Sequence, residues 1–344
     1  MDREIAEHKA EHETLGSEVS AAMSGESAAL GQGTANPKAM TRATVRALCQ
    51  LNTEFYERNA ASFSQTRTVP WEGWRRCMAA CGFDDSDGAA LDQPVNAQTA
   101  DSVLDIACGN LRFEAFLANA YPHIDWSFFA VDNCEPLVAS GQEDVAKKVH
   151  FTCEDIVSNL LDGLPAAEPA NVPALAAATP FDLVVSFGFL HHIPSFDLRQ
   201  QFLLEALSQV KPGGYLVVSF WQFLNDPAKR AKIEQTHAEA LAFFEGSLEP
   251  NDYFLGWKNE PDNYRYCHHF SNEEIDRIIT ARAPHATVVE SFSADGKPGN
   301  LNSYVVFKRK ELPIDSIPVT NALSSMTDEE IKQLKVKTLV LGVG

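Results

Sequence analysis

The sequence predicts an α/β fold: a doubly wound, mostly parallel seven-stranded sheet that ends in a C-terminal antiparallel hairpin and carries an N-terminal helical lid. Three observations predict it. Short apolar runs alternate with amphipathic segments between residues 100 and 222, as in parallel strands joined by helical crossovers. Two apolar runs flank the glycine-containing residues 296–300, which predicts the hairpin. Residues 41–80 repeat apolar side chains at helical spacing ahead of the sheet.

Each expected strand is a short run rich in Val, Ile, Leu or Phe, which is typical of strands buried on both faces. The parallel strands are expected at residues 102–107, 126–131, 149–153, 181–187 and 215–221. Helices are expected between them at residues 113–120, 135–146 and 198–210. The hairpin strands are residues 287–292 and 302–307. Ser271 is expected to begin a further helix, because Glu274 follows it at the spacing of a capping box.

The chain is expected to divide into four parts. These are a disordered tail over residues 1–40, a helical cap over 41–99, the main domain over 100–310 and a C-terminal extension over 311–344. Within the main domain, residues 223–270 carry several aromatic side chains and are expected to cover a substrate.

The composition excludes several classes of protein. There is no apolar run long enough for a membrane helix, and the N-terminus lacks the apolar core of a secretory signal. The 7 cysteines show no C-x-x-C spacing, so we expect no disulfide framework, no metal site and a cytoplasmic location. The formal net charge of −19 argues against a broad basic surface for nucleic acid, although small basic clusters occur at residues 74–76 and 229–232.

The first expected strand ends in an acid that points to the cofactor. Asp105 precedes a tight turn in which the small residues Ala107 and Gly109 let the backbone approach a ligand. In a dinucleotide site this turn faces a pyrophosphate, which an acid would repel. S-adenosylmethionine carries no phosphate, and its methionyl end has an ammonium from which Asp105 could accept a hydrogen bond. We therefore expect S-adenosylmethionine in preference to a nicotinamide cofactor.

Two further acids follow the next two expected strands. Asp132, with Asn133 beside it, is placed to accept the ribose hydroxyls. Asp155 is placed to accept the adenine amino group, while Ile156 packs on the ring. The carboxyl ends of parallel strands meet at one edge of the sheet, where such folds bind ligands. Any one of these acids could instead be a helix N-cap or a surface residue.

This region resembles the class I S-adenosylmethionine-dependent methyltransferases. Their first motif is usually D/E-x-G-x-G-x-G, whereas this sequence has Asp105, Ala107, Gly109 and Leu111 at those positions. The resemblance continues through the expected fourth strand and its sequel, residues 181–194, and through Lys-Pro-Gly-Gly before the fifth strand. It implies a Rossmann-like fold and a methyltransferase activity, and it adds two residues to the expected cofactor site. These are Ser186 and Phe187.

Two flanking segments are similar to those of a narrower group, the tRNA wobble-uridine carboxymethyl methyltransferases. The first segment, residues 55–71, contains Tyr56 and Arg67, and the second, residues 264–270, contains Arg265. In the second segment Cys267 replaces a tyrosine of that group. The resemblance implies tRNA as a partner and adds Tyr56 to the cofactor contacts. Candidate partners are thus tRNA or a small-molecule substrate, together with a small partner protein.

The basic and histidine side chains suggest how an acceptor could be bound. Arg67, on a segment that could cover the pocket, could clamp the carboxylate of the cofactor or of a substrate, and Arg265 and His268 could hold an acidic substrate. His191 follows the fourth strand and is the best candidate base if the acceptor is a hydroxyl or an amine. A carboxylate acceptor would need no strong base. Each of these side chains could instead belong to a surface ion pair or a packed loop.

Three alternatives remain beside a methyltransferase that acts on an oxygen of a modified tRNA. The acidic balance and the aromatic residues of 223–270 favour a small-molecule methyltransferase acting on an acidic metabolite. Leu111 in place of glycine is the one feature that favours a catalytically silent binding module. A nicotinamide-dependent enzyme is disfavoured by Asp105.

Overall fold

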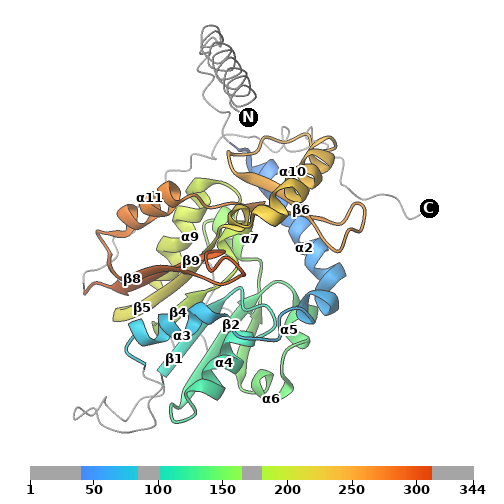
Figure 1. The fold of residues 1–344 in the computed structure, drawn as a ribbon. Coiled ribbons are helices and arrows are strands. Elements are labelled where there is room, and N and C mark those ends of the chain that lie inside the picture. The colour runs from blue at the N-terminus through green and yellow to red at the C-terminus, as the bar shows by residue number, and fades with distance from the viewer. Residues whose placement is uncertain (1–39, 84–100, 165–179, 312–344) are drawn as a thin grey trace, which may run out of the picture. The chain divides into compact units, whose positions relative to one another are not determined.

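A seven-stranded sheet forms the centre of the computed structural model, which describes residues 40–83, 101–164 and 180–311 (Figure 1). The strand order is β3-β2-β1-β4-β5-β9-β8, with the first five strands parallel and the last two antiparallel. The predicted fold class is therefore confirmed. The strands are β1 (Asp101–Ile106), β2 (Trp126–Asp132), β3 (Val149–Cys153), β4 (Phe181–Ser186), β5 (Val210–Trp221), β8 (Ala286–Ala294) and β9 (Asn302–Arg309). The expected tail over residues 1–40 and the expected extension over 311–344 lie outside the described residues, apart from residues 40 and 311.

Helices cover both faces of this sheet. They are α2 (Arg42–Ser64), α3 (Glu72–Ala80), α4 (Arg112–Ala120), α5 (Glu135–Ala139), α6 (Glu143–Ala146), α7 (Ile156–Leu161), α9 (Phe196–Ser208), α10 (Pro227–Leu241) and α11 (Asn272–Arg282), with short 3-10 turns η2 (Leu190–His192) and η3 (Phe223–Asn225). None of the described helices is long and apolar enough to cross a membrane.

The alternation of side chains along β1 separates two core clusters. Leu104 and Ile106 pack in a cluster that includes residues of α7, α9 and α11. Val103 points to the other face and packs in a cluster with residues of α3 and α4. All three side chains are fully buried. Because Asp105 follows the same alternation as Val103, its side chain lies on the face that α3 and α4 cover.

Two expected helices are interrupted in the structure. The helical pattern of residues 41–80 forms α2 and α3, with Pro70 in the connection between them, where its ring and missing N–H disfavour helix. The segment 135–146 forms α5 and α6. Gly141 lies between them, and a Cβ at this position would be 2.6 Å from the Asn110 carbonyl oxygen. This glycine thus permits a close approach between α5 and the turn after β1.

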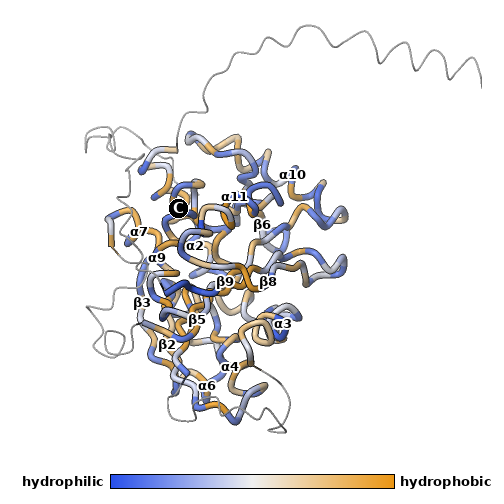
Figure 2. Tube along the Cα trace, turned by 90° about the vertical axis from the view of Figure 1, so that its left-hand side faces the viewer, coloured by the Kyte–Doolittle hydropathy of each residue, from blue (hydrophilic) through white to orange (hydrophobic). Residues whose placement is uncertain are grey.

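The segment 223–270 has more regular structure than the sequence predicted. It contains α10 and a separate two-stranded sheet of β6 (Asp252–Gly256) and β7 (Tyr264–His268). Strand β7 packs on α2, and β6 packs on α10. Helix α10 is largely hydrophilic (Figure 2), and Ala240 is its one buried residue. The small sheet therefore carries the Arg265 segment against the N-terminal helix.

Candidate active site

A cavity of about 580 Å³ opens at the carboxyl ends of β1, β2 and β4. Such an edge is where open α/β sheets bind ligands. Of the predicted site residues, twelve line it: Tyr56, Arg67, Asp105, Ala107, Gly109, Asp132, Asn133, Asp155, Ile156, Phe187, His191 and Arg265. Two do not, Ser186 and His268.

The turn after β1 retains the backbone shape that glycines would give it. Ala107, Gly109 and Leu111 have φ angles of 67°, 57° and 56°. All three lie in the left-handed region, which costs a residue with a Cβ about 1–2 kcal/mol. The Leu111 side chain is buried with Ala115 and Val138, and this burial offsets its strain. The two departures from the glycine motif therefore do not change the path of the turn.

Asp105 has the properties expected of an ammonium acceptor. It is 3% exposed, and its Oδ1 has no hydrogen-bond partner among the described residues. Burial raises the pKa of Asp105 well above its usual value, and the neighbouring Glu114 and Asp132 raise it further. Burying a carboxylate without a partner raises the free energy of the folded protein, so a cation bound at this point of the cavity would stabilise it.

Asp132 and Asp155 each have a structural contact as well as a place in the cavity wall. The two oxygens of Asp132 accept hydrogen bonds from the amides of Gly109 and Cys134, both at 2.9 Å. Burial raises the pKa of Asp132, and these amides partly counteract the rise. Asp155 caps α7 through the amide and hydroxyl of Ser158. Each carboxylate oxygen has a second lone pair, so ribose and adenine contacts remain available.

Helix α2 and the residues after it cover this cofactor side of the cavity. The Asn110 side chain donates to Ser64 Oγ at 2.9 Å and to the Arg67 carbonyl at 3.1 Å. Asn133 donates to Thr53 Oγ1 at 3.0 Å. These bonds join the turns after β1 and β2 to the N-terminal segment.

Arg265 is a buried cation without an anion. Its guanidinium is surrounded by five aromatic rings at 5.0–6.0 Å from the ring centroids. The residue is 5% exposed, and no carboxylate of the described residues forms an ion pair with it. Burial lowers the pKa of Arg265, but Tyr56 and Cys267 outweigh this effect and leave the pKa raised. The side chain is thus charged and available to an acidic ligand.

Arg67 brings a second positive charge to the same cavity. Its guanidinium lies 4.6 Å from the centroid of Phe63 and donates to Thr66 Oγ1 at 3.0 Å. Burial lowers the pKa of Arg67, and repulsion from Arg265 lowers it further. Neither arginine has a carboxylate partner in the described parts of the chain. An anion between them would be stabilised by both.

The two histidines of η2 have different environments. His191 is 5% exposed, lines the cavity and has no partner for Nδ1 among the described residues. Burial lowers its pKa well below the usual range, and His192 and Arg265 add to the effect. In contrast, His192 is bonded through both nitrogens, to Tyr56 Oη at 2.8 Å and to the Tyr266 carbonyl at 3.0 Å. Both rings are therefore neutral, and the Nδ1 of His191 is free to accept or donate.

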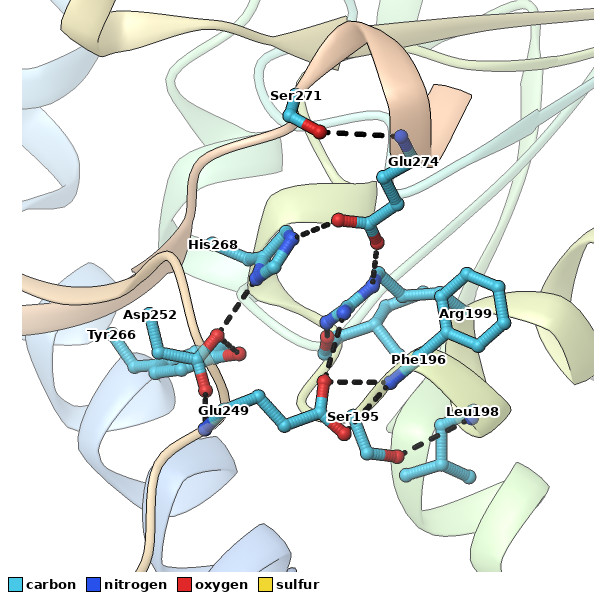
Figure 3. Close-up of polar contacts among 11 residues, drawn as sticks. Ser195, Phe196, Leu198, Arg199, Glu249, Asp252, Tyr266, His268, Ser271 and Glu274 are labelled. Carbon is cyan, nitrogen blue, oxygen red and sulfur yellow. Dashed lines mark hydrogen bonds and ion pairs between the residues drawn. The ribbon is translucent and has the colours of Figure 1, made fainter. Parts of the chain in front are cut away.

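His268 lies away from the cavity, contrary to the expectation that it helps to hold a substrate. Side chains alternate along β7, so Arg265 and Cys267 face one way and His268 faces the other. The two ring nitrogens of His268 lie 2.8 Å from Asp252 Oδ1 and 2.7 Å from Glu274 Oε2. Figure 3 shows that these carboxylates belong to a buried network with Arg199. This network, and not the cavity, is the setting of His268.

The other predicted residue outside the cavity is Ser186. It is fully buried and donates from Oγ to the Ile106 carbonyl at 2.9 Å. The capping box at Ser271 is formed in part: Ser271 Oγ accepts from the Glu274 amide at 3.2 Å, but the Glu274 side chain turns to Arg199 and His268 (Figure 3). In both cases a neighbouring element binds a side chain that was expected to have another partner.

Sequence reasoning missed several residues of the cavity. His192, Asn52 and Trp221 line it, as does Cys49 on α2. Asn52 binds the backbone of β7 through both side-chain atoms, at the amide and carbonyl of Tyr266. Its helical spacing from Tyr56 places both side chains on one face of α2, which is the signal that could have revealed it.

One group of side chains in the described residues has the composition of a metal site: His191, His192 and Cys267, with ligand atoms within 4.8 Å of one another. Both nitrogens of His192 are already bonded, and the Arg265 guanidinium lies close enough to Cys267 to lower the pKa of its thiol, against the larger rise that burial causes. A cation here would face the charge of Arg265 at close range. The cluster therefore fits an anion better than a metal.

Comparison with known proteins gives a family for the central part of the chain. A model of the methyltransferase domain matches residues 103–214. A putative methyltransferase of Encephalitozoon cuniculi (strain GB-M1) is 25% identical over 245 residues, which are 70% of this chain and 91% of the relative.

Among solved structures, the chain is similar to the 1,6-didemethyltoxoflavin-N1-methyltransferase of Burkholderia thailandensis, crystallised with 1,6-didemethyltoxoflavin and S-adenosylhomocysteine. The identity is 15% and the TM-score 0.47, over 78% of this chain and 91% of that one. A second similar structure is an S-adenosylmethionine-dependent methyltransferase of Methanosarcina mazei, with 18% identity and a TM-score of 0.43 over 64% of this chain and 99% of that one.

The matched domain begins in β1 and ends in β5, so it spans the turn after β1 and every acid assigned to the cofactor. The match to the methyltransferase domain confirms the expectation of S-adenosylmethionine as the cofactor. The matched domain and the methyltransferase relative thus support S-adenosylmethionine-dependent methyltransferase activity for this chain.

Proposed function

We propose that this methyltransferase transfers the methyl group to a carboxylate oxygen of its acceptor, and that the acceptor is the carboxymethyl group of a modified wobble uridine in tRNA. The observation that carries the proposal is Arg265, a buried cation in the cavity with no anion beside it in the described residues. Arg67 faces the same space. Two guanidinium groups can hold a carboxylate by charge-assisted hydrogen bonds.

The reaction requires little of the protein beyond the positioning of the cofactor and the acceptor. Bound S-adenosylmethionine supplies a methyl group that is already activated for displacement. A carboxylate attacks without losing a proton, so no strong base is required. This agrees with the properties of His191, because burial lowers its pKa and makes the imidazole a weak base. The tasks left to this chain are to hold the acceptor with Arg265 and Arg67, to orient it, and to exclude water with the aromatic side chains around Arg265.

The tRNA acceptor is supported by the flanking segments that contain Arg67 and Arg265 and by positive charge at the cavity. Lys229 of α10 and Arg112 of α4 line the cavity together with Arg67. The competing acceptor is a small acidic metabolite, which the net charge of −19 favours. A small partner protein that supplies basic surface would reconcile the acidic chain with tRNA.

A methyl-transfer assay distinguishes these acceptors. The full chain is incubated with methyl-labelled S-adenosylmethionine and either bulk tRNA from cells that lack wobble-uridine esters or a panel of small carboxylic acids. Labelled product is then treated with mild alkali. A methyl ester releases its label as methanol, whereas a methyl group on nitrogen or carbon stays bound.

Alkali-labile label in the tRNA fraction supports the proposal, and alkali-labile label on a small acid supports the second acceptor. Alkali-stable label in every fraction would contradict carboxylate methylation. Arg265→Gln serves as the matched variant, because it removes the charge that the proposal depends on while it leaves Asp105, Asp132 and Asp155 intact.

A further inference from the structure

His268 is a buried histidine whose two ring nitrogens both face carboxylates. Its Nδ1 lies 2.8 Å from Asp252 Oδ1, and its Nε2 lies 2.7 Å from Glu274 Oε2 (Figure 3). The His268 side chain is 1% exposed, and those of Asp252 and Glu274 are 0% and 10% exposed. A carboxylate only accepts hydrogen bonds, and a neutral imidazole has a single N–H. Both short contacts are therefore hydrogen bonds only when the ring carries two hydrogens.

The other partners of the two acids keep both of them ionised. Asp252 Oδ1 also accepts from the Tyr266 hydroxyl at 2.7 Å, and its Oδ2 accepts from the Glu249 amide at 2.8 Å. Glu274 Oε1 accepts from Arg199 Nε at 3.1 Å. Burial raises the pKa of Glu274, but its contacts with the histidine and with Arg199 outweigh this effect and leave the pKa below its usual value. The additional proton of the cluster thus belongs on the imidazole ring.

The charge balance of the network leads to the same assignment. Its acids are Glu249, Asp252 and Glu274, whereas Arg199 is the guanidinium that pairs with the first and the third. A neutral His268 would leave three acids against one cation, and a protonated ring brings a second cation to them. The remaining negative charge then falls on Glu249, whose side chain is 28% exposed and therefore hydrated. Buried carboxylates without a counter-charge destabilise a fold, so the doubly protonated ring is the form that fits.

The other histidines near this ring are in surroundings that favour the neutral form. Burial lowers the pKa of His269 to about 4, and the charge of His268 lowers it further. Burial also lowers the pKa of His191 well below its usual range, and the neighbouring basic groups, His268 among them, add to the effect. The Phe270 ring meets the His268 ring edge to face, with centroids 4.9 Å apart. Of these three histidines, His268 is the one that carboxylates contact on both sides.

The network fixes the strand that carries Arg265. Asp252 lies opposite His268 in the register of β6 and β7. Tyr266 and His268 point to the network side of β7, and both bind the same oxygen of Asp252. Arg265 points to the other side of the strand and lines the cavity. Because Glu274 belongs to α11, which packs in the core of the main sheet, its bond to His268 joins β7 to that core.

We propose that His268 is a positioning residue for methyl transfer: as an imidazolium bound between Asp252 and Glu274, it anchors β7 and so holds the guanidinium of Arg265 in place for the acceptor. The protonated state follows from the contacts of the ring. The positioning role rests on the proposed function, in which Arg265 binds the carboxylate of the acceptor. Without the imidazolium, two buried carboxylates repel each other across the space that it fills, and β7 loses its bond to α11.

Nitrogen-15 NMR of the full chain, labelled at its histidines, tests the protonated state. At about pH 8 an ordinary histidine is neutral, because its pKa is about 6.5. We expect the signals of His268 to show a hydrogen on each ring nitrogen at this pH, and His268→Gln identifies these signals by their loss. The same sample unfolded in urea is the reference and should contain only neutral rings. A neutral ring for His268 in the folded protein would overturn the proposal.

A double-variant cycle tests the positioning role. With the acceptor identified by the alkali-lability assay, His268→Gln should lower kcat/KM by about tenfold or more, since Arg265 is no longer held in place. The dissociation constant of S-adenosylhomocysteine should stay within about twofold of the wild type. The double variant His268→Gln/Arg265→Met should be as active as Arg265→Met alone, because His268 acts through Arg265. His285→Gln is the matched control and should retain the wild-type kcat/KM.

The possible failures are distinguishable. Additive losses in the double variant would overturn the positioning role and leave the proposed function intact. Wild-type activity of Arg265→Met would contradict the proposed function, and with it the positioning role, but not the protonated state seen by NMR. If His268→Gln does not fold, Glu274→Gln provides the second variant. A glutamine amide can donate to a neutral ring, so the His268 signals should become those of a neutral imidazole. Unchanged imidazolium signals in Glu274→Gln would show that this acid does not hold the proton on the ring, contrary to the proposal.

Discussion

The hydroxyl of Tyr56 lies 2.8 Å from Nε2 of His192, and this contact joins α2 to the turn after β4. The other nitrogen of His192 faces the Tyr266 carbonyl at 3.0 Å, so Nδ1 carries the hydrogen and Nε2 accepts from Tyr56. The Tyr56 oxygen is then free to accept from Arg265 Nη1, 3.4 Å away. A chain of hydrogen bonds thus fixes a guanidinium that has no carboxylate of its own in the described residues.

The first prediction tests this chain of bonds. Tyr56→Phe should lower the free energy of unfolding by about 1–2 kcal/mol, because it leaves buried groups of His192 and Arg265 without a partner. It should also lower kcat/KM for methyl transfer by about tenfold or more, since Arg265 loses the bond that orients it. Denaturant unfolding and steady-state kinetics measure the two effects. Tyr253→Phe, outside the cavity, is the control. Wild-type values of both quantities for Tyr56→Phe would show that the chain of bonds orients nothing.

Replacement of Arg265 should separate stability from activity. Arg265→Met removes an unpaired buried charge and keeps an apolar stem among the aromatic rings, so the free energy of unfolding should stay within about 1 kcal/mol of the wild type. Activity on an acidic acceptor should fall about 100-fold or more, because the charged contact to the carboxylate is lost. The dissociation constant of S-adenosylhomocysteine should not change.

The activity of Arg265→Lys should lie between that of the wild type and that of Arg265→Met, since a lysine keeps the charge but cannot form the planar two-point contact. Kinetics with the acceptor identified by the alkali-lability assay provide the measurement. A wild-type kcat/KM for Arg265→Met would rule out this arginine as the carboxylate-binding group.

The neutral state of His192 predicts how stability responds to acid. Burial lowers the pKa of His192 to about 3, with a further contribution from Arg265. The unfolded chain binds this proton near the ordinary value of about 6.5, so the stability that the group contributes is present above pH 6.5 and is lost as the pH falls toward 3. The expected loss from this group is about 1.4 kcal/mol per pH unit within that window.

In His192→Gln, the free energy of unfolding should depend less steeply on pH over the same window. The reduction in slope should correspond to one bound proton. Urea unfolding at pH 6.5, 5.5 and 4.5 measures it. His285→Gln is a suitable control, because His285 lies outside the cavity. An identical slope in wild type and His192→Gln would mean that His192 is protonated in the folded protein.

The buried network around Arg199 holds the sheet that carries Arg265. Arg199 pairs with Glu249 at 3.0 Å and with Glu274 at 3.1 Å, and it donates to the Ile193 carbonyl. Arg199→Gln should destabilise the protein by about 3–5 kcal/mol, because buried carboxylates then lose their counter-charge. The exposed Arg58→Gln should change stability by less than about 0.5 kcal/mol. Thermal unfolding compares the two, and equal melting temperatures would contradict a stabilising role for the network.

The sequence predicted the strands of the main sheet but not those of the small one. Each strand of the main sheet is an apolar run between turn signals, and those signals are local. Strands β6 and β7 were missed because their pairing depends on tertiary contacts, such as the binding of the Tyr266 backbone by Asn52 of α2. Local patterns do not encode a partner that is distant in sequence.

The same distinction applies to the cavity. The acids at the strand ends could be predicted, because parallel strands bring their carboxyl ends together whatever the helices do. The direction of His268 could not, because the strand that sets it was not recognised. Its segment held one residue that lines the cavity, Arg265, and one that does not, and only the alternation along β7 separates them.

The last prediction concerns the turn that replaces glycines. Ala107 has a φ of 67°, where a Cβ costs about 1 kcal/mol and a glycine would be relaxed. Ala107→Gly removes this strain but makes the unfolded chain more flexible, so the two effects nearly cancel and stability should change by less than about 0.5 kcal/mol. The matched change Ala115→Gly lies within α4, in a right-handed helix, and should cost about 1 kcal/mol. Denaturant unfolding of both variants gives the comparison. Equal destabilisation of about 1 kcal/mol by both would mean that Ala107 is not strained, and that the turn prefers alanine for its packing.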